Sequence, residues 1–594
     1  MAVQCYNAMD NRKKGVEQMK YLLKHLKQYK KQSILAPLFK MLEALFDLFV
    51  PLVVANIINV GIGNGDNIYI LKQCGILVLL ALIGITCSFT AQYFAAVASV
   101  GCATGLRHDL FSHIQKLGYS EIDTVGTSTL ITRMTSDINQ VQNGINMAMR
   151  LLLRSPFIVF GAMIMAFTIN TRAALIFLVA IPVLSLIVYG IMGVTNPGYK
   201  GIQEKLDQVM NHVRENLTGV RVIRAFGKEK EEVESFENVN GQLNAMQLRI
   251  GHLSALMNPM TYVVVNLAII AILKAGASSI NGGVLLSGDV VALVNYMSQI
   301  LVELVKMANT IILISKALAS MNRIAGVLDT EPAMEFQKQE SALPESEEAV
   351  RFEHVGMIYQ GAAEESLTDV SFCAKKGQTI GVIGGTGSGK STLVNLLPRF
   401  YDATSGKISI FGNPVEKWGK EELRTRVGMV MQKAQLFQGT IRSNLLWGKQ
   451  DATDEQLWHA LEIAQAAEVV RGKEKGLDEP VEQGGRNFSG GQKQRLTIAR
   501  ALVSEPDILI LDDSASALDF ATDASLRKAL NTLPESITVF IVSQRTSSLK
   551  HADQILVLDD GCLVGQGTHE HLLETCEVYR EIHESQFKKG DEVQ

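Results

Sequence analysis

Several features that would point to other classes of protein are scarce in this sequence of 594 residues. Its seven cysteines form no CxxC pair, which fits reduced thiols and indicates neither a disulfide framework nor a metal site. The formal net charge is only −4 and no segment forms a basic stripe, which argues against a nucleic-acid partner. The N-terminus is polar and basic before any apolar stretch begins, so we expect no cleavable signal peptide.

Long apolar runs, in contrast, are plentiful, but they are concentrated in the first half of the chain. A helix needs about twenty predominantly apolar residues to cross a bilayer. Six runs meet this requirement, at residues 34–60, 75–99, 150–169, 173–194, 255–276 and 284–314. The rest of the chain could not shelter six such helices as a buried core. The sequence therefore predicts an α-helical transmembrane domain of six long helices, in contact with the lipid bilayer.

The distribution of positive charge predicts the orientation of these spans. The N-terminal segment carries a cluster of lysines, namely Lys13, Lys14, Lys20, Lys24, Lys27, Lys30 and Lys31. The positive-inside rule keeps this segment in the cytoplasm, and an even number of spans returns the C-terminal half there. Residues 16–31 are predicted to form an interfacial amphipathic helix. The segments 100–149 and 195–254 are predicted to be long cytoplasmic loops. We expect a multi-pass protein of a bacterial plasma (inner) membrane.

Glu43, Asp47 and Glu303 are acidic residues inside the predicted spans, where charge is costly and often functional. Glu43 and Asp47 share one face of the first span because they are four residues apart, and Glu303 lies in the sixth beside Lys306. One interpretation is a cavity wall that attracts cationic amphipathic substrates. The other is that these residues lie in helix portions that extend into water.

The composition changes after the last span. Residues 331–349 are acidic and contain proline, as expected of a linker, and short β-rich runs begin at Val350. The expected domains are therefore an N-terminal segment 1–33, a transmembrane domain 34–330, the linker 331–349 and a second domain 350–594.

The second domain contains an apolar strand, a glycine-rich turn and a helix that match the phosphate-loop pattern GxxxxGK[ST]. The candidate phosphate-binding residues are Gly384, Gly385, Thr386, Gly387, Ser388, Gly389, Lys390, Ser391 and Thr392. Backbone N–H groups of such a turn hold phosphates, the lysine reaches the β- and γ-phosphates, and the Ser391 hydroxyl binds Mg²⁺. Further along, the apolar run DILILDD ends in Asp512 and Asp513, and Asp512 is in the position that holds Mg²⁺ in phosphate-loop ATPases.

Between these motifs lies NFSGGQKQRLTIARAL, and with it the whole chain resembles the ATP-binding-cassette family, in its exporter branch. The segment that corresponds to the family signature, usually LSGGQ, consists of Phe488, Ser489, Gly490, Gly491 and Gln492. The resemblance implies an α/β phosphate-loop nucleotide-binding domain with a helical signature subdomain, and ATP and Mg²⁺ as cofactors. It also implies that the signature closes over ATP held by a second half-transporter, in a head-to-tail dimer.

The same resemblance assigns further positions. Tyr359 resembles the aromatic residue that stacks on adenine, Gln432 the glutamine that senses Mg²⁺, and Asp519 the residue that links the two ATP sites. The segments 118–144 and 216–232 resemble the coupling segments that connect the two domains of exporters.

Two positions depart from the family pattern. Efficient members place a glutamate after the magnesium aspartate, where it activates the attacking water, but this chain has Asp513. They also carry a histidine in the switch after the next strand, where this chain has Gln544 in IVSQR. A base misplaced by roughly 1 Å can cost about a hundredfold in rate. These substitutions predict a degenerate site that binds ATP and hydrolyses it slowly.

The pattern therefore resembles the impaired subunit of bacterial heterodimeric multidrug exporters, which move hydrophobic or amphipathic compounds out of the cell. A homodimeric lipid or drug exporter with Asp513 as a working base remains an alternative. An ATP-gated channel or regulator is another. The six spans exclude a soluble chromosome-organising ATPase with the same signature.

Overall fold

The computed structural model describes residues 20–281, 283, 285–334, 336, 346–514 and 518–587. These residues form two compact units, which are described separately. One contains the described residues up to Gln115 together with Ser128–Thr330. The other contains Lys116–Thr127 and the described residues from Glu331 onward.

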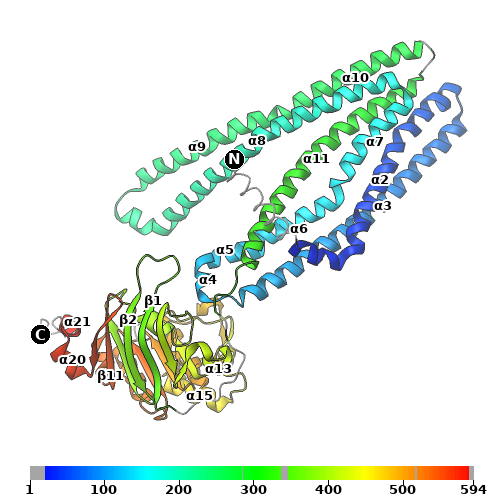
Figure 1. The fold of residues 1–594 in the computed structure, drawn as a ribbon. Helices are drawn as coiled ribbons and strands as arrows, with labels where there is room; N and C mark the ends of the chain where they lie inside the picture. The colour runs from blue at the N-terminus through cyan, green and yellow to red at the C-terminus, as the bar shows by residue number, and fades with distance from the viewer. Residues whose placement is uncertain are drawn as a thin grey trace. The chain divides into compact units, whose positions relative to one another are not determined.

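The first unit is helical, and it confirms the six predicted spans (Figure 1). Six helical segments in the described residues are long and apolar enough to cross a membrane: Lys20–Ile62, Asn67–Ile114, Thr127–Ile169, Thr171–Ala225, Glu229–Asn281 and Ser287–Leu328. Their elements are η1 (Lys27–Tyr29), α2 (Lys30–Asn56), η2 (Ile57–Ile62), α3 (Asn67–Ile114), α5 (Thr127–Thr132), η3 (Arg133–Asp137), α6 (Ile138–Met147), η4 (Ala148–Leu152), α7 (Arg154–Ile169), α8 (Thr171–Ala225), α9 (Glu229–Ala255), α10 (Met257–Asn281) and α11 (Ser287–Leu328).

The predicted long loops at 100–149 and 195–254 are wrong, because both stretches are mostly helical. Hydropathy marks only the apolar part of a helix, whereas polar helix formers such as Glu, Lys and Gln continue it into water. The chain between α8 and α9 reverses in only three residues, 226–228, where Gly227 has a φ of +62°. Of the predicted N-terminal helix 16–31, residues 16–19 lie outside the described part, and the remainder is helical.

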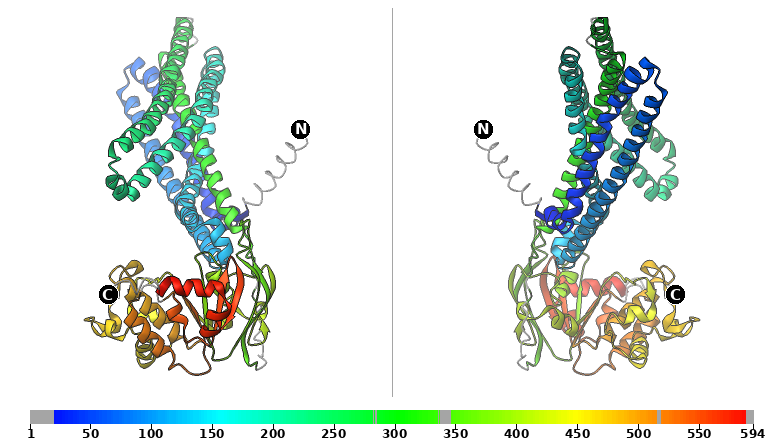
Figure 2. Two further views of the ribbon diagram at one scale, coloured as in Figure 1. Left: turned by 90° about the vertical axis from the view of Figure 1, so that its left-hand side faces the viewer. Right: turned by 90° about the vertical axis from the view of Figure 1, so that its right-hand side faces the viewer.

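Small residues let the helices of this unit approach closely. Helices α2, α3, α7 and α11 run side by side (Figures 1 and 2). A Cβ atom on Gly161 of α7 would lie 2.4 Å from Leu48 Cδ1 of α2, so any larger residue there would require the Leu48 side chain to shift. The buried Tyr296 of α11 donates a hydrogen bond to the Leu48 carbonyl, 2.6 Å away. These contacts hold α2, α7 and α11 against one another.

The second unit contains three sheets. An antiparallel sheet has the order β2-β1-β4-β5, a mostly parallel sheet has the order β12-β11-β3-β10-β9-β6, and β7 pairs with β8. The strands are β1 (Glu348–Met357), β2 (Leu367–Lys375), β3 (Thr379–Gly384), β4 (Ser405–Ile410), β5 (Asn413–Pro414), β6 (Val427–Val430), β7 (Gly439–Thr440), β8 (Pro480–Val481), β9 (Ile508–Asp512), β10 (Thr538–Val542), β11 (Gln554–Asp559) and β12 (Cys562–Gly567).

The parallel strands determine where the site lies. β10 pairs in parallel with β3 on one side and with β9 on the other, and its residue Val542 is opposite Val382 of β3 and Asp512 of β9. The carboxyl ends of these three strands therefore meet at one edge, which is where open α/β sheets bind ligands. β1 begins at Glu348, inside the expected linker 331–349, of which residues 335 and 337–345 lie outside the described part.

Helices surround the sheets. They are α4 (Tyr119–Val125), α12 (Lys390–Asn395), η5 (Val415–Lys417), α13 (Lys420–Arg426), α14 (Ile441–Leu445), α15 (Asp454–Ile463), α16 (Ala467–Arg471), η6 (Gly476–Asp478), η7 (Gln483–Gly485), α17 (Gly490–Val503), α18 (Phe520–Leu530), α19 (Thr546–Leu549), α20 (His569–Thr575) and α21 (Glu577–Phe587). The predicted fold class is confirmed: six long apolar helices precede an α/β phosphate-loop domain with a helical subdomain.

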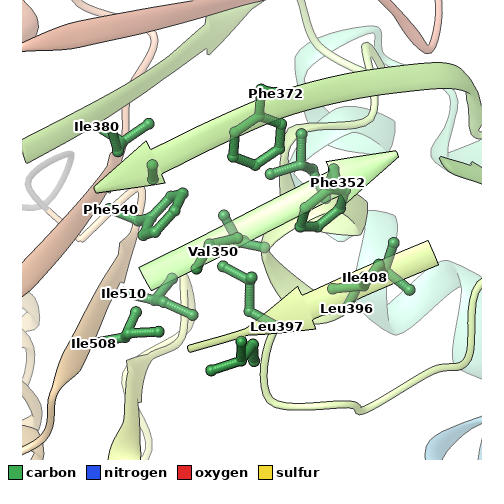
Figure 3. Packing of buried hydrophobic residues seen from close by; sticks show 14 of the residues in the cluster. Val350, Phe352, Phe372, Ile380, Leu396, Leu397, Ile408, Ile508, Ile510 and Phe540 are labelled. Carbon is green, nitrogen blue, oxygen red and sulfur yellow. The ribbon is translucent and has the colours of Figure 1, made fainter. Parts of the chain in front are cut away.

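Separate hydrophobic cores support the two halves of this unit. The first joins the antiparallel sheet to β3, β9 and β10, with Phe352 and Phe372 stacked at 4.6 Å beside Phe540 (Figure 3). The second contains Leu457 of α15, Leu496 of α17, and Phe488, which lies just before α17. The phosphate loop thus belongs to the first core and the signature segment to the second.

Candidate functional site

The predicted phosphate loop connects β3 to α12 as the sequence suggested. Gly387 and Gly389 adopt φ values of +87° and +91°, which favour glycine. A Cβ atom on Gly389 would lie 2.6 Å from the carbonyl oxygen of Ser366. The glycines therefore allow the tight turn that directs backbone N–H groups toward the start of α12.

Lys390, the first residue of α12, lies over this loop. Its Nζ donates hydrogen bonds to the Gly384 carbonyl at 3.0 Å, to the Gly385 carbonyl and to Ser388 Oγ. Burial lowers the pKa of this ammonium, against the opposing effects of Asp513 and Asp512. A partly buried cation beside N–H groups is suited to bind an anion such as phosphate.

The predicted magnesium residues Ser391 and Asp512 are brought together. Ser391 Oγ donates a hydrogen bond to Asp512 Oδ1 at 3.2 Å, and Asp512 is buried at the end of β9. Burial raises the pKa of Asp512, and the adjacent Asp513 adds to this effect. A hydroxyl and a carboxylate are ligands that Mg²⁺ prefers, and a cation would relieve the buried charge, so these residues fit the ion. The third predicted residue, Gln432, instead donates to Asp513 Oδ2 at 3.4 Å.

Asp513 and Gln544 lie at the same edge of the sheet. Asp513 has a φ of +44°, and its N–H donates to the Val542 carbonyl at 3.1 Å, which holds its backbone beside β10. Burial raises the pKa of the Asp513 carboxyl, while Gln432, Lys390 and Arg545 oppose this shift. Gln544 lies two residues after the end of β10, and its side chain is exposed.

Tyr359 lies beside the phosphate loop and is linked to it. Its hydroxyl donates to Thr392 Oγ1 of α12 at 3.1 Å. Its ring also meets that of Tyr401 edge-on, with centroids 5.1 Å apart. Tyr401 in turn donates a hydrogen bond to Asp123 Oδ2 of α4 at 2.6 Å. Sequence reasoning missed Tyr401, because no motif spacing marks a tyrosine in this loop.

The coupling segment 118–144 divides between the two units. Its first part, α4, packs on the nucleotide domain, where Tyr119 stacks on Phe400 at 4.5 Å and Ser120 and Thr124 contact Gln360. The remainder belongs to the helical unit. The second predicted coupling segment, 216–232, forms the turn between α8 and α9 and the helix ends beside it.

The predicted signature segment opens α17. Ser489 is its N-cap: its Oγ accepts a hydrogen bond from Gln492 N at 3.3 Å, while Gln492 Oε1 accepts one from Ser489 N at 3.0 Å. This capping box satisfies the Gln492 N–H, and the start of such a helix is a position at which backbone N–H groups can bind an anion. Phe488 is buried and anchors the segment, whose remaining residues are Gly490 and Gly491. Asp519 caps α18, where it accepts a hydrogen bond from Thr522 N at 2.8 Å.

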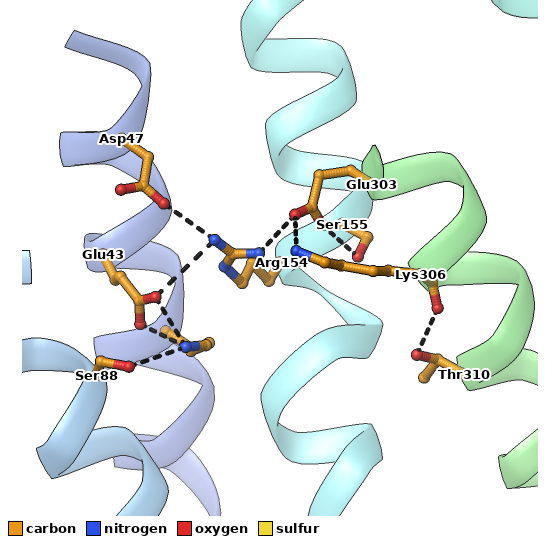
Figure 4. Close-up of polar contacts among 9 residues, drawn as sticks. Glu43, Asp47, Ser88, Arg154, Ser155, Glu303, Lys306 and Thr310 are labelled. Atoms are coloured by element: carbon orange, nitrogen blue, oxygen red, sulfur yellow. Dashed lines mark hydrogen bonds and ion pairs between the residues drawn. The ribbon is translucent and has the colours of Figure 1, made fainter. Parts of the chain in front are cut away.

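The predicted acidic residues of the spans are also brought together, by Arg154 at the start of α7 (Figure 4). Its guanidinium lies 2.9 Å from Asp47, 2.7 Å from Glu303 and 3.9 Å from Glu43. The side chains of Arg154 and Glu303 are only 11% and 3% exposed. The charges therefore form an ion-pair network between α2, α7 and α11.

Further partners complete this network. Lys40 lies 2.6 Å from Glu43 and donates to Ser88 of α3, while Ser155 and Lys306 both donate to Glu303. Sequence reasoning missed Lys40 and Arg154. Lys40 could have been found as an i, i+3 partner of Glu43, whereas only the packing of α7 against α2 and α11 reveals the partners of Arg154.

Comparisons with known families agree with this architecture. Residues 33–304 match the family model "ABC transporter transmembrane region". Residues 367–516 match the model "ABC transporter". The two matches correspond to the helical unit and to the domain that contains the phosphate loop.

Known relatives match along nearly the whole chain. The chain is 36% identical over 576 residues to "Uncharacterized ABC transporter ATP-binding protein YfiB" of Bacillus subtilis, which covers 97% of this chain and 100% of the relative. It is 29% identical to "Putative multidrug export ATP-binding/permease protein YgaD" of the same species, over 96% of this chain and 98% of that protein. It is 27% identical to the "ATP-dependent lipid A-core flippase" of Vibrio parahaemolyticus, over 96% and 97%.

Proposed function

The chain belongs to the ABC transporter family, and we propose that it is the degenerate-site half of a heterodimeric exporter. It is a multi-pass membrane protein of the half-transporter type, with one transmembrane and one ATP-binding domain, and its ATPase domain couples ATP hydrolysis to transport. In the proposal, its own site binds ATP and hydrolyses it slowly, while its signature segment completes a competent site on a different chain.

The placement of Asp513 carries this proposal. The residue lies directly after the magnesium candidate Asp512, at the position that corresponds by resemblance to the glutamate that activates the attacking water. Its backbone is held by the hydrogen bond to Val542, so the main chain cannot easily move to compensate for a side chain one methylene short. A general base must come within about 3 Å of its proton, and roughly 1 Å of misplacement can cost about a hundredfold.

Gln544 supports the same conclusion. Its amide can donate one hydrogen bond to a γ-phosphate, but it cannot carry the positive charge available to the usual histidine. Ser391, Asp512 and Gln432 would hold Mg²⁺, which would supply positive charge beside the phosphates of ATP. Lys390 and the loop N–H groups would bind the phosphates, and Tyr359 would stack on adenine. The site therefore has the residues needed to bind ATP, whereas Asp513 and Gln544 would activate the attacking water only weakly.

The signature segment is suited to serve a partner. It is supported by a different core from the phosphate loop, and backbone N–H groups at the start of its capped helix can bind an anion. Two chains arranged head to tail would place each signature over the other chain's ATP, with Asp519 near both sites. ATP binding would then favour the closed dimer, and hydrolysis at the competent site would release it, which shifts the membrane domain between two packings.

The proposed substrate is a hydrophobic or amphipathic compound moved out of the cell, in line with the names of the multidrug and lipid A-core relatives. Glu43, Asp47 and Glu303 are paired with Lys40, Arg154 and Lys306, which removes the reason to expect a preference for cations. The N-terminal lysines and the even number of spans support cytoplasmic termini. The bacterial relatives support a location in a bacterial plasma membrane.

The first test is the ATPase activity of the full-length chain purified alone and co-purified with a second half-transporter. We expect turnover only in the pair, and its loss when the partner's catalytic glutamate is replaced by glutamine. Brisk turnover by this chain alone, stopped by Asp513→Ala, would contradict the proposal. It would favour a homodimeric exporter, in which the raised pKa of Asp513 would help it act as a base.

A further inference from the structure

Hydrogen bonds connect helix α21 to the switch loop, which is the segment that runs from the end of β10 to the start of α19. Gln586 of α21 makes three hydrogen bonds to this loop. Its Oε1 accepts from Thr546 N at 3.0 Å and from Thr546 Oγ1 at 3.2 Å, and its Nε2 donates to the Gln544 carbonyl at 2.7 Å. The amide therefore bridges the main chain on both sides of Arg545.

A second side chain of α21 contacts the same point. His583 Nδ1 lies 3.0 Å from Thr546 Oγ1. Thr546 is fully buried at the start of α19, and the neighbouring Ser543 is 4% exposed. The residues on either side of Gln544 in this loop, Ser543 and Thr546, are thus buried, while the Gln544 side chain is exposed.

The helix that provides these contacts is itself anchored. Tyr579 of α21 is fully buried in a hydrophobic core. Its neighbours in this core are Leu572 of α20, Cys576 just after α20, and Ile555 and Val557 of β11. Its hydroxyl contacts His569 Nδ1 at 2.7 Å. Gln586 is therefore held to the sheet by packing two turns earlier in the same helix, so its hydrogen bonds restrain the loop.

We propose that Gln586 is a positioning residue for nucleotide discrimination: it fixes the main chain of the switch loop so that the Gln544 amide can meet the γ-phosphate at this chain's own site. The inference rests on the proposed function, because it takes Gln544 to contact ATP there. Since ADP lacks the γ-phosphate, the effect of Gln586 belongs to ATP binding and not to ADP binding.

The test uses the full-length complex and 8-azido-ATP and 8-azido-ADP, which label each chain separately. For each nucleotide, the concentration that gives half-maximal labelling of this chain is measured in wild type, Gln586→Ala, Gln586→Glu and the control Glu581→Ala. Glu581 is an exposed residue of the same helix. We expect Gln586→Ala to raise the value for ATP about fivefold, a size typical of one or two neutral hydrogen bonds, and to leave ADP unchanged. Gln586→Glu keeps the acceptor for Thr546 but loses the donor to Gln544. Its half-maximal ATP concentration should therefore lie between those of wild type and Gln586→Ala.

Two outcomes would overturn the inference. Equal losses for ATP and ADP would indicate general loosening, and a Gln586→Ala value equal to that of Glu581→Ala would show that the contact has no role. Gln544→Ala separates this failure from failure of the proposed function. If Gln544→Ala leaves the ratio of ATP to ADP affinity unchanged, the assumed role of Gln544 is wrong. If it lowers the ratio and Gln586→Ala does not, only the role of Gln586 is wrong. If both lower it, the double variant should add nothing further.

Discussion

Charge is buried in both halves of this molecule, and the two halves compensate it differently. In the membrane unit, Arg154 lies within 2.9 Å of Asp47 and Glu303, and Lys40 and Lys306 neutralise what remains (Figure 4). In the nucleotide unit, Lys390 donates to main-chain carbonyls, while two carboxylates follow one another at the end of β9.

The pKa directions in the nucleotide unit show the consequence. Burial raises the pKa of Asp512 and Asp513 and lowers that of Lys390, so the ionised form of each group is disfavoured. Binding of Mg²⁺ and phosphate would reverse these shifts. The membrane network is balanced within itself and should stabilise the fold, whereas the nucleotide cluster is suited to ionic ligands.

The strongest test of this contrast is Arg154→Ala. Removing one partner of a buried ion-pair network leaves the others uncompensated, which costs about 3–5 kcal/mol in the free energy of unfolding. We expect a large fall in the melting temperature of the purified protein, of the same size with and without ATP. Arg172→Ala, at an exposed arginine in the first turn of α8, serves as the control. A melting temperature close to that of Arg172→Ala would mean that the network does not stabilise the bundle.

Lys390→Ala should give the opposite pattern. Without the ammonium, ATP affinity at this chain's site should fall about a hundredfold, as expected when a charge-assisted contact to phosphate is lost. The melting temperature without nucleotide should hardly change, because this cation mainly contacts carbonyls of its own loop. Chain-resolved photolabelling measures the first quantity, with Lys407→Ala, an exposed residue of β4, as the control. If Lys390→Ala unfolds the domain, its charge is structural and the contrast fails.

The fold was predictable where the signal is local along the chain. Apolar runs revealed all six spans, because each crosses lipid on its own. The same signal failed for the polar halves of α3, α8 and α9, which hydropathy does not distinguish from loops. Gly227, with its positive φ, is a local mark of where α8 ends.

The nucleotide site divides in the same way. The phosphate loop, Asp512 and Ser489 are readable because each motif is contiguous and its geometry follows from a strand, a turn and a helix. Tyr401 and Gln586, and Arg154 in the membrane unit, could not be identified from the sequence. Each forms its hydrogen bonds with residues forty or more positions away in the chain. Such partners are set by packing, on which a single sequence carries no direct information.

A gain of function sharpens the comparison within the nucleotide site. Asp513→Glu with Gln544→His should raise ATP turnover about tenfold, because it restores the reach of the base and a cationic switch residue. The measurement is made in a complex whose partner has its catalytic glutamate replaced by glutamine, so that hydrolysis arises at this chain's site. Each single replacement is the matched control and should give less. Unchanged turnover in the double variant would mean that these two positions do not limit hydrolysis.

The smallest expected effect concerns the pH dependence of stability. Burial raises the pKa of Asp512 above that of an unfolded chain, so the nucleotide-free native state binds more protons than the unfolded state in the interval between the two values. The contribution of Asp512 to stability should therefore fall as pH rises through this interval, and remain lower above it. Asp512→Asn removes that titration, so its melting temperature should be slightly higher than that of wild type near neutral pH and depend less on pH. In the presence of Mg²⁺ and ATP the order should reverse, because the ion stabilises only the carboxylate. If the wild type instead gains stability relative to Asp512→Asn as pH rises across this interval, without nucleotide, Asp512 is already compensated, as the membrane charges are.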